Sequence, residues 1–199
     1  MKLRKVIVGA YAANCYILTD EKESKSAVID PGDDVKNIID AIDASNTKVE
    51  YILLTHGHAD HTSAAEEIRN KYNAPIAISR EDYNMMKSRE LMYGKLIDEV
   101  DIYIEDNQVF EFGNIKLKAL YTPGHTPGGV SFLGEDMVFT GDTLFQNSVG
   151  RTDFTGGDFN AIIDSIKNRL MTLPDEMVVF PGHGSKTSIK EEKMYNPFL

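Results

Sequence analysis

The feature that most constrains this sequence is a cluster of three histidines and one aspartate within six positions. Residues 56–61 read His-Gly-His-Ala-Asp-His and follow the apolar run 51–54 after a single threonine. One histidine in a polar loop is usually solvated or hydrogen-bonded, but imidazole and carboxylate together are ligands that first-row metals accept without sulfur. His56 and His58 are two positions apart, not four as on one face of a zincin helix. Their side chains therefore converge only in a tight, non-helical loop, and the cluster predicts a metal site at the end of a strand.

The remaining two histidines stand in glycine- and proline-rich turns that also follow apolar runs. His125 lies in the turn Thr-Pro-Gly-His-Thr-Pro-Gly-Gly, and His183 lies in Phe-Pro-Gly-His-Gly. A third turn, Phe-Thr-Gly-Asp-Thr, presents Asp142 in the same manner. All five histidines of the chain thus belong to candidate metal-binding loops.

The order of these motifs resembles the metallo-β-lactamase superfamily, and within it the small glyoxalase II-like (hydroxyacylglutathione hydrolase-like) hydrolases. Asp30, in the run Val-Ile-Asp-Pro-Gly, fits the first motif of that family, and residues 56–61 fit the second. His125, Asp142 and His183 fit the third, fourth and fifth motifs. Five motifs in order are far more specific than one, and they extend over nearly the whole chain.

The resemblance implies two divalent metal ions per chain, with zinc as the first expectation and iron or manganese as alternatives. Each ion would be held by three residues, and one aspartate would bridge both ions. The implied ligands are His56, His58 and His125 for the first metal, Asp60, His61 and His183 for the second, and Asp142 as the bridge.

Strand-like and helix-like segments alternate along the chain, which predicts an α/β (α+β) fold. The resemblance implies the four-layer αβ/βα metallo-β-lactamase sandwich, in which two sheets pack together with helices outside. A length of 199 residues fits one domain, so we expect a single domain over 1–199 without the C-terminal glutathione-binding helical domain of full glyoxalase II enzymes. Strands are expected at 2–9, 15–19, 27–29, 49–54, 75–79, 109–112, 115–121, 130–133, 137–139 and 177–180. Helices are expected after an N-cap at Asp33, over about 62–72, from about 81, over about 158–170, and after an N-cap at Ser188.

Charge and cysteine content limit the compartments and partners that this chain suits. The formal net charge is -10, from 21 basic and 31 acidic residues, which disfavours a surface that follows nucleic-acid phosphates. The single cysteine, Cys15, cannot form an intrachain disulfide, and a buried, inert thiol is favoured over a nucleophile. The N-terminal apolar run is too short for a signal peptide, and no run of about 18 apolar residues exists. We therefore expect a cytoplasmic protein that binds neither nucleic acid nor membrane.

Two further residues and one segment, besides Asp30, are candidates for supporting the metal centre or the substrate. Tyr11, in a loop of small and apolar residues, either lines the pocket or packs over the first hairpin. Arg151 stands in a Gly-Arg-Thr-Asp-Phe loop that resembles both the small hydrolases and the persulfide dioxygenases; it either pairs with Asp153 or contacts substrate. The segment 85–106 mixes methionine, tyrosine and charges, and is either a lid over the site or a run of ordinary core contacts.

The expected chemistry follows from what two neighbouring metals can do. A pair about 3.5–4 Å apart lowers the pKa of a shared water and polarises the acyl oxygen that this water attacks. Asp60 would be both a ligand and the catalytic residue that orients the hydroxide or accepts its proton. The resemblance implies hydrolysis of a small-molecule thioester such as S-lactoylglutathione, whose thiolate leaving group needs little protonation. The alternatives are a persulfide dioxygenase with one iron held by two histidines and one aspartate, and a non-catalytic metal-binding domain.

Overall fold

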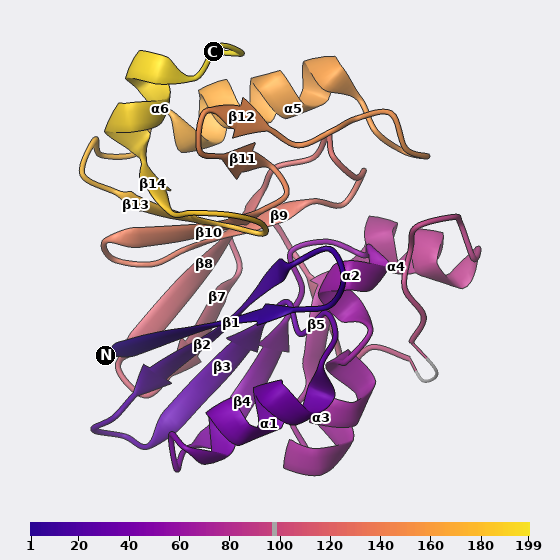
Figure 1. The fold of residues 1–199 in the computed structure, drawn as a ribbon, viewed down its shortest axis with the longest axis vertical. Coiled ribbons are helices and arrows are strands. Elements are labelled where there is room, and N and C mark those ends of the chain that lie inside the picture. The colour runs from indigo at the N-terminus through magenta and orange to yellow at the C-terminus, as the bar shows by residue number, and fades with distance from the viewer. Residues whose placement is uncertain (97–98) are drawn as a thin grey trace.

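Two six-stranded sheets pack face to face in the computed structural model, which describes residues 1–96 and 99–199 (Figure 1). In the first sheet, β1 to β3 are antiparallel and β3 to β6 are parallel. Its strands, in spatial order, are β1 (Lys2–Val8), β2 (Ala13–Asp20), β3 (Lys25–Ile29), β4 (Lys48–Leu53), β5 (Ile76–Ser79) and β6 (Ile102–Ile104). In the second sheet only β10 and β13 are parallel. Its order is β14 (Thr187–Ser188), β13 (Val178–Pro181), β10 (Met137–Gly141), β9 (Val130–Leu133), β8 (Ile115–Tyr121) and β7 (Val109–Phe112).

Helices cover the outer face of each sheet. Figure 1 shows α1 and α3 beside the first sheet, and α5 and α6 beside the second. The helical elements are α1 (Val35–Asp43), α2 (Ala59–Thr62), α3 (Ala65–Tyr72), α4 (Arg80–Lys87), α5 (Phe159–Ser165), the π-helix η1 (Ile166–Leu170) and α6 (Ile189–Tyr195). A short hairpin of β11 (Leu144–Phe145) and β12 (Ser148–Val149) completes the elements. The four-layer αβ/βα sandwich is therefore confirmed.

The burial pattern of β2 shows that both faces of the first sheet are covered. Every residue of β2 is buried, as expected for a strand packed on both sides. Cys15 and Ile17 belong to the apolar cluster under α1 and α3, whereas Tyr16 and Leu18 belong to the cluster between the sheets. Burial raises the pKa of the Cys15 thiol, with the Asp30 carboxylate adding to the shift. The expected burial of the Cys15 thiol is thus confirmed.

Three local predictions of the helices need correction. The first helix begins at Val35, and its cap position is Asp34 in a left-handed conformation with φ 50°, not Asp33. The Asp33 carboxylate accepts a hydrogen bond from the Asp34 amide, and the Asp34 carboxylate accepts one from Gly9. The helix expected at 62–72 is α3, which begins at Ala65, because Thr62 is the last residue of α2. The end of the helix expected at 158–170 is a π-helix. The short strands β6, β11, β12 and β14 carry too few residues for a recognisable alternation.

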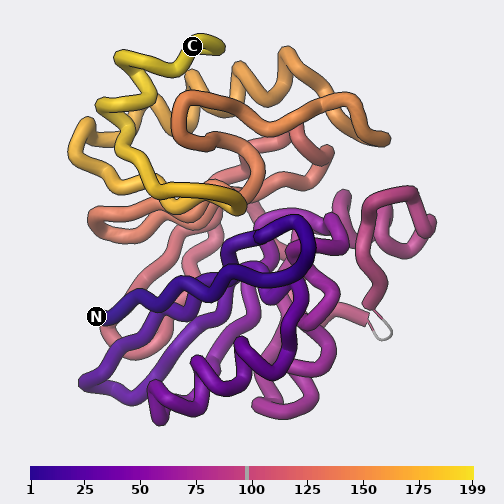
Figure 2. Tube along the Cα trace, viewed as in Figure 1, coloured from indigo at the N-terminus to yellow at the C-terminus, as the bar shows by residue number. Residues whose placement is uncertain are grey.

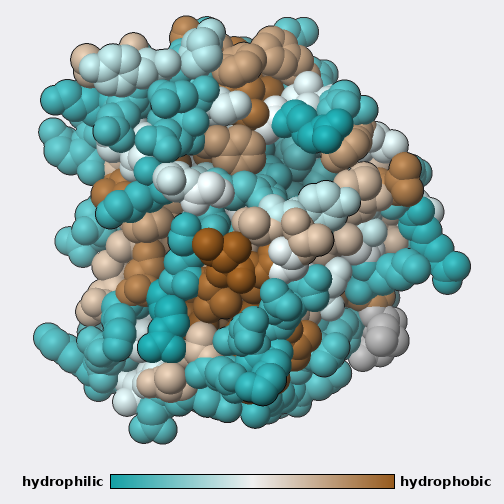
Figure 3. All heavy atoms as spheres, viewed as in Figure 1, coloured by the Kyte–Doolittle hydropathy of each residue, from teal (hydrophilic) through white to brown (hydrophobic). Residues whose placement is uncertain are grey.

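The N-terminal hairpin and the loop after β13 meet at one edge of the sandwich. The Asn14 amide, at the start of β2, donates to the Gly182 carbonyl at 2.7 Å, and Figure 2 shows the C-terminal loop after β13 beside the N-terminal hairpin. The face in Figure 3 is largely hydrophilic, with hydrophobic side chains in separate patches. In the described part of the chain, no helix is long and apolar enough to span a membrane.

Candidate metal centre

All seven predicted ligands lie at one end of the sandwich. This follows from strand direction, because the ligands stand after the carboxyl ends of β4, β8, β10 and β13. Three backbone bonds hold these loops together: Val130 N donates to the Thr55 carbonyl at 2.8 Å, Gly182 N to Gly141 at 2.7 Å, and Ala64 N to Pro31 at 3.0 Å. The centre is therefore assembled from the ends of both sheets.

The first cluster comprises His56, His58 and His125. A nitrogen from each of the three rings lies within 4.8 Å of the others, and His58 Nδ1 is 2.9 Å from His125 Nε2. At most 5% of each residue is exposed. The non-helical loop predicted for His56 and His58 is present, and Asp60 and His61 stand on the single turn of α2 that follows it.

The second cluster comprises Asp60, His61 and His183. His61 Nε2 is 3.2 Å from His183 Nε2, and Asp60 Oδ2 is 3.3 Å from that same His183 nitrogen. Asp142 lies between the two clusters, with Oδ1 3.4 Å from His61 Nε2 and Oδ2 3.6 Å from His125 Nε2. Its carboxylate therefore faces both clusters at once.

The outer nitrogens of three histidines face fixed oxygen acceptors. His61 Nδ1 is 3.1 Å from Asp30 Oδ2, His125 Nδ1 is 2.7 Å from the Arg151 carbonyl, and His183 Nδ1 is 3.1 Å from the Tyr11 carbonyl. A neutral ring that donates from Nδ1 keeps its Nε2 lone pair free, which is the usual support for a metal-binding histidine. The Nε2 atoms of these three rings all lie 3.4–3.6 Å from an Asp142 carboxylate oxygen.

Several buried polar atoms at the centre have no hydrogen-bond partner among the described residues. They are His56 Nε2, His58 Nε2 and Asp142 Oδ1. An unsatisfied buried polar group costs about 1–3 kcal/mol, so three at one place are not explained by packing. Imidazole and carboxylate donors suit zinc, iron or manganese. The donor set therefore fits divalent metal ions.

The two clusters differ in their electrostatics. Burial and the neighbouring His125 lower the pKa of His58 to about 3, and burial with the neighbouring imidazoles also lowers the pKa of His56. Burial opposes protonation of His61 too, but the Asp142 and Asp30 carboxylates prevail and raise its pKa to about 9. In the first cluster His56 and His58 are thus neutral, whereas a cation must release a proton from His61 to bind the second cluster.

Two of the candidate supporting residues act through their backbone. The Tyr11 side chain is 68% exposed, so it does not pack over the hairpin, and it is the Tyr11 carbonyl that accepts from His183. The Arg151 guanidinium donates two hydrogen bonds of 2.7 Å to Asp153 and lies 3.9 Å from the Phe154 ring centroid. In the structure, Arg151 thus pairs with Asp153 within its own loop.

The segment 85–106 contributes a wall beside the first cluster. The Met92 carbonyl accepts from Ala59 N at 2.8 Å, and Gly94 N donates to the Gly57 carbonyl at 2.9 Å. The Tyr93 ring lies 4.8 Å from the His58 ring. Residues 92–94 are therefore attached to the metal loop and do not form a free lid; positions 97–98 of the same prediction lie outside the described residues.

Sequence reasoning missed the residues that align the ligands. Thr55 donates from its amide to Asp30 Oδ1 and from its hydroxyl to Asp30 Oδ2, both at 2.7 Å, and its Oγ1 lies 3.0 Å from His56 Nδ1. The buried Asp82 contacts two of the ligand loops. The position of Thr55 directly before the histidine cluster could have indicated its role, whereas no feature of the sequence distinguished Asp82.

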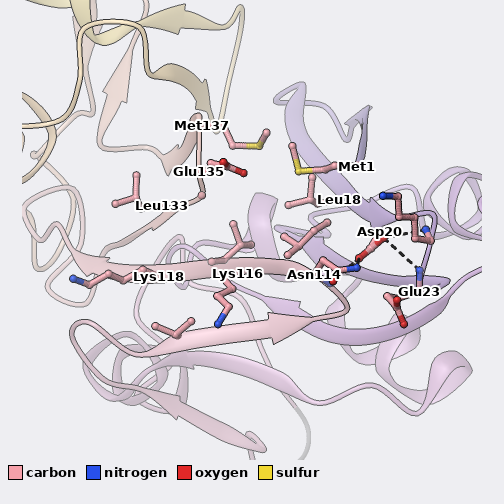
Figure 4. Close-up of a pocket in the computed structure, with 15 residues that line it drawn as sticks. Met1, Leu18, Asp20, Glu23, Asn114, Lys116, Lys118, Leu133, Glu135 and Met137 are labelled. Carbon is pink, nitrogen blue, oxygen red and sulfur yellow. Dashed lines mark hydrogen bonds between the residues drawn. The ribbon is translucent and has the colours of Figure 1, made fainter.

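The molecule also has a cleft away from this centre. A cleft of about 840 Å³ lies where the sheets part at the opposite end, lined by Leu18, Leu117 and Met137 with charged residues at its rim (Figure 4). Its lining includes none of the seven ligands. Asp20, which lines this cleft, is the strand-register partner of Lys25 at the start of β3. Asp30 follows the opposite end of β3, so the cleft and the metal centre lie at opposite ends of that strand.

Comparison with known proteins agrees with this geometry. Residues 8–183 match the family model described as the metallo-beta-lactamase superfamily. The chain is 33% identical to "Hydroxyacylglutathione hydrolase GloC" of Haemophilus influenzae over 100% of this chain and 98% of that protein. It is 34% identical to "Probable metallo-hydrolase YqgX" of Bacillus subtilis, with the same coverage.

Solved structures of similar proteins share the fold. The B3 metallo-beta-lactamase BLEG-1 superposes with a TM-score of 0.92 at 30% identity, covering 100% of this chain and 99% of that one. TTHA1623 in a di-iron-bound form gives 0.88 at 32% identity, with 98% and 100% covered. ETHE1 from Myxococcus xanthus gives 0.86 at 30% identity, with 99% and 84% covered. This chain belongs to the metallo-beta-lactamase superfamily of metal-dependent hydrolases.

Proposed function

We propose that this chain is a binuclear metal-dependent hydrolase of small hydroxyacyl thioesters, S-lactoylglutathione among them. The observation that carries the proposal is the position of Asp142, whose two carboxylate oxygens face the two clusters at 3.4 and 3.6 Å. A carboxylate placed in this way suits a bridge between two cations. The name of the GloC relative, a hydroxyacylglutathione hydrolase, supports the choice of substrate class.

In the proposed centre, the two clusters and Asp142 would together hold two metal ions. His56, His58 and His125 would hold one metal, Asp60, His61 and His183 the other, and Asp142 both. Zinc is our first choice, and the di-iron form of TTHA1623 supports iron as the alternative. When bound, the metals would supply an acidified water and a Lewis acid for the acyl oxygen.

Asp60 is the residue that we assign to the attacking water. Burial would raise the pKa of Asp60, but the hydrogen bond from His183 and the charge of His61 lower it to about 2. The group therefore stays ionised at neutral pH, as an acceptor that orients a water O–H. The Asp60 and His183 side chains are 23% and 27% exposed, so water and substrate reach the centre from this side. The leaving thiolate needs no general acid.

Thioester hydrolysis and oxygen consumption, measured on one preparation, test this function. We expect cleavage of S-lactoylglutathione with a high KM and turnover of other small thioesters, without oxygen uptake in the presence of glutathione persulfide. The likeness to ETHE1 and the Gly-Arg-Thr-Asp-Phe loop support the mononuclear iron dioxygenase as second candidate. Oxygen uptake without thioester cleavage would replace our proposal with that one.

Metal content gives a direct prediction. Elemental analysis of protein purified without added metal, and again after zinc addition, should approach two metal ions per chain, because two three-residue clusters share no histidine. A single tightly held iron, with no second equivalent taken up after addition, would contradict the binuclear centre.

Replacement of Arg151 should weaken catalysis moderately. Arg151→Ala removes the pair with Asp153 and loosens the loop whose carbonyl orients His125. The pair is exposed to solvent and therefore weak, so we expect kcat/KM to fall by no more than about fivefold. Arg169→Ala is the matched control, because Arg169 makes a similar double contact with Asp106 away from the ligand loops. Equal losses in both variants would show that Arg151 has no special part.

A further inference from the structure

A buried carboxylate outside both clusters links the loops that carry the first cluster. Asp82 stands in the first turn of α4 and is 0% exposed. Its Oδ2 accepts a hydrogen bond from Gly57 N at 2.8 Å, and its Oδ1 accepts one from Gly128 N at 2.7 Å. Gly57 lies between His56 and His58, and Gly128 lies three residues after His125. One side chain therefore contacts both ligand loops at once.

The packing around Asp82 requires glycine at both donor positions. A Cβ on Gly128 would lie 2.0 Å from Ser79 Oγ and 2.8 Å from Asp82 Oδ1. A Cβ on Gly57 would lie 2.9 Å from Tyr93 Cδ1 and 3.2 Å from the Asp82 carbonyl oxygen. Both loops thus approach the start of α4 as closely as their backbones allow, which leaves little room for either to shift.

The charge state of Asp82 suits a double acceptor. Burial raises its pKa to about 6, although the Gly57 and Gly128 amides work in the opposite direction. The carboxylate is therefore still mostly ionised at neutral pH, and it sits at the helix N-terminus, where negative charge is favoured. An ionised carboxylate offers two acceptor oxygens and no donor. Asparagine in the same place would turn an NH₂ group toward one of the two amides.

We infer that Asp82 is a positioning residue that fixes the His56–His58 loop against the His125 loop, and thereby sets the affinity of the first metal site. The ring nitrogens of His58 and His125 are 2.9 Å apart, so a small relative shift of the loops would change the ligand geometry. Loss of groups that orient metal ligands typically lowers metal affinity by about 10- to 100-fold. The inference depends on the metal centre of the proposed function, but not on its substrate.

Zinc titration of metal-free protein, in competition with a chromophoric chelator, tests the inference. For Asp82→Asn we expect one of the two equivalents to weaken by about 10- to 100-fold, with the other within about threefold of wild type. The weakened equivalent should be the one that His58→Ala removes. Unchanged affinity for both equivalents would overturn the inference.

A matched control separates positioning from general loss of stability. Asp20 is 4% exposed and likewise accepts from backbone amides, those of Lys22 at 3.0 Å and Asn114 at 2.7 Å, but at the far end of the sandwich. Asp20→Asn should lower the thermal midpoint and leave both zinc affinities unchanged. If Asp20→Asn weakened zinc as much as Asp82→Asn does, the effect would be general and the inference wrong.

A second variant alters the contact between Asp82 and Gly128 at the glycine. Gly128→Ala places a Cβ against Asp82 Oδ1 and should weaken the same zinc equivalent, so the inference stays testable if Asp82→Asn does not fold. Wild-type affinity in Gly128→Ala would count against it. A wild-type protein that binds two zinc ions without cleaving thioesters would refute the proposed substrate and leave this inference intact.

Discussion

Asp142→Ala is expected to abolish nearly all thioester hydrolysis while the fold persists. The carboxylate that faces both clusters would be lost, and with it the common ligand of the two sites. Loss of groups that merely orient ligands costs about 10- to 100-fold, so loss of the bridge should exceed about a hundredfold in kcat at saturating zinc. His58→Ala should behave in the same way, because it removes a ring from the first cluster.

The fold should tolerate the change at Asp142. The side chain stands in the turn after β10, is 12% exposed, and its Oδ1 has no hydrogen-bond partner among the described residues. Without metal, the unfolding free energy should therefore stay within about 1 kcal/mol of wild type. Asp175→Ala, which removes an exposed carboxylate paired with Lys193, is the control for charge loss. Wild-type hydrolysis by Asp142→Ala at saturating zinc would rule out the binuclear mechanism.

Gly182→Ala is expected to be nearly as damaging, although it deletes no ligand. A Cβ at this position would lie 2.2 Å from Asp142 Oδ1 and 2.7 Å from His61 Cε1. Either the Asp142 carboxylate or the His61 ring must move, and each movement displaces a predicted ligand of the second metal. We expect the zinc content to fall toward one per chain and kcat to fall by about a hundredfold, as for a lost ligand contact.

A neighbouring glycine provides the control for Gly182. No atom lies within 4 Å of a Cβ placed on Gly184, but its φ of 74° disfavours alanine. Gly184→Ala should cost about 1–2 kcal/mol of stability through backbone strain alone, and keep two zinc ions and its activity. The steric explanation fails if Gly182→Ala retains full zinc content, or if Gly184→Ala loses as much zinc.

The ligand loops could be predicted from the sequence because their signal is local. Imidazole and carboxylate groups stand within a few residues of one another, directly after apolar strands, as in residues 56–61. Asp82 gave no such signal. It looks like any acidic residue in the first turn of a helix capped by Ser79, and its partners Gly57 and Gly128 are 25 and 46 residues away. Only the packing of α4 against both loops reveals the connection.

Tyr11 and Arg151 show a different limit of sequence reasoning. The sequence indicated the right positions but assigned the role to their side chains. In the structure, their carbonyl oxygens make the contacts with His183 and His125. Every residue has a carbonyl group, so side-chain identity cannot report such a role. The same holds for the first helix, where Asp33 and Asp34 are equally good caps by composition and the contact with Gly9 distinguishes them.

Each cluster takes predicted ligands from both sheets, His58 with His125 and His61 with His183, so a bound ion would cross-link the two halves of the sandwich as a disulfide does in a secreted protein. His183 is also the last ligand to leave the ribosome, which means that a nascent chain cannot close the second site until its second sheet is almost complete. Maturation of this protein should therefore depend on the supply of metal at the moment of release. A cell short of metal would accumulate chains whose sheets lack this cross-link, and these are the chains that proteases would remove first.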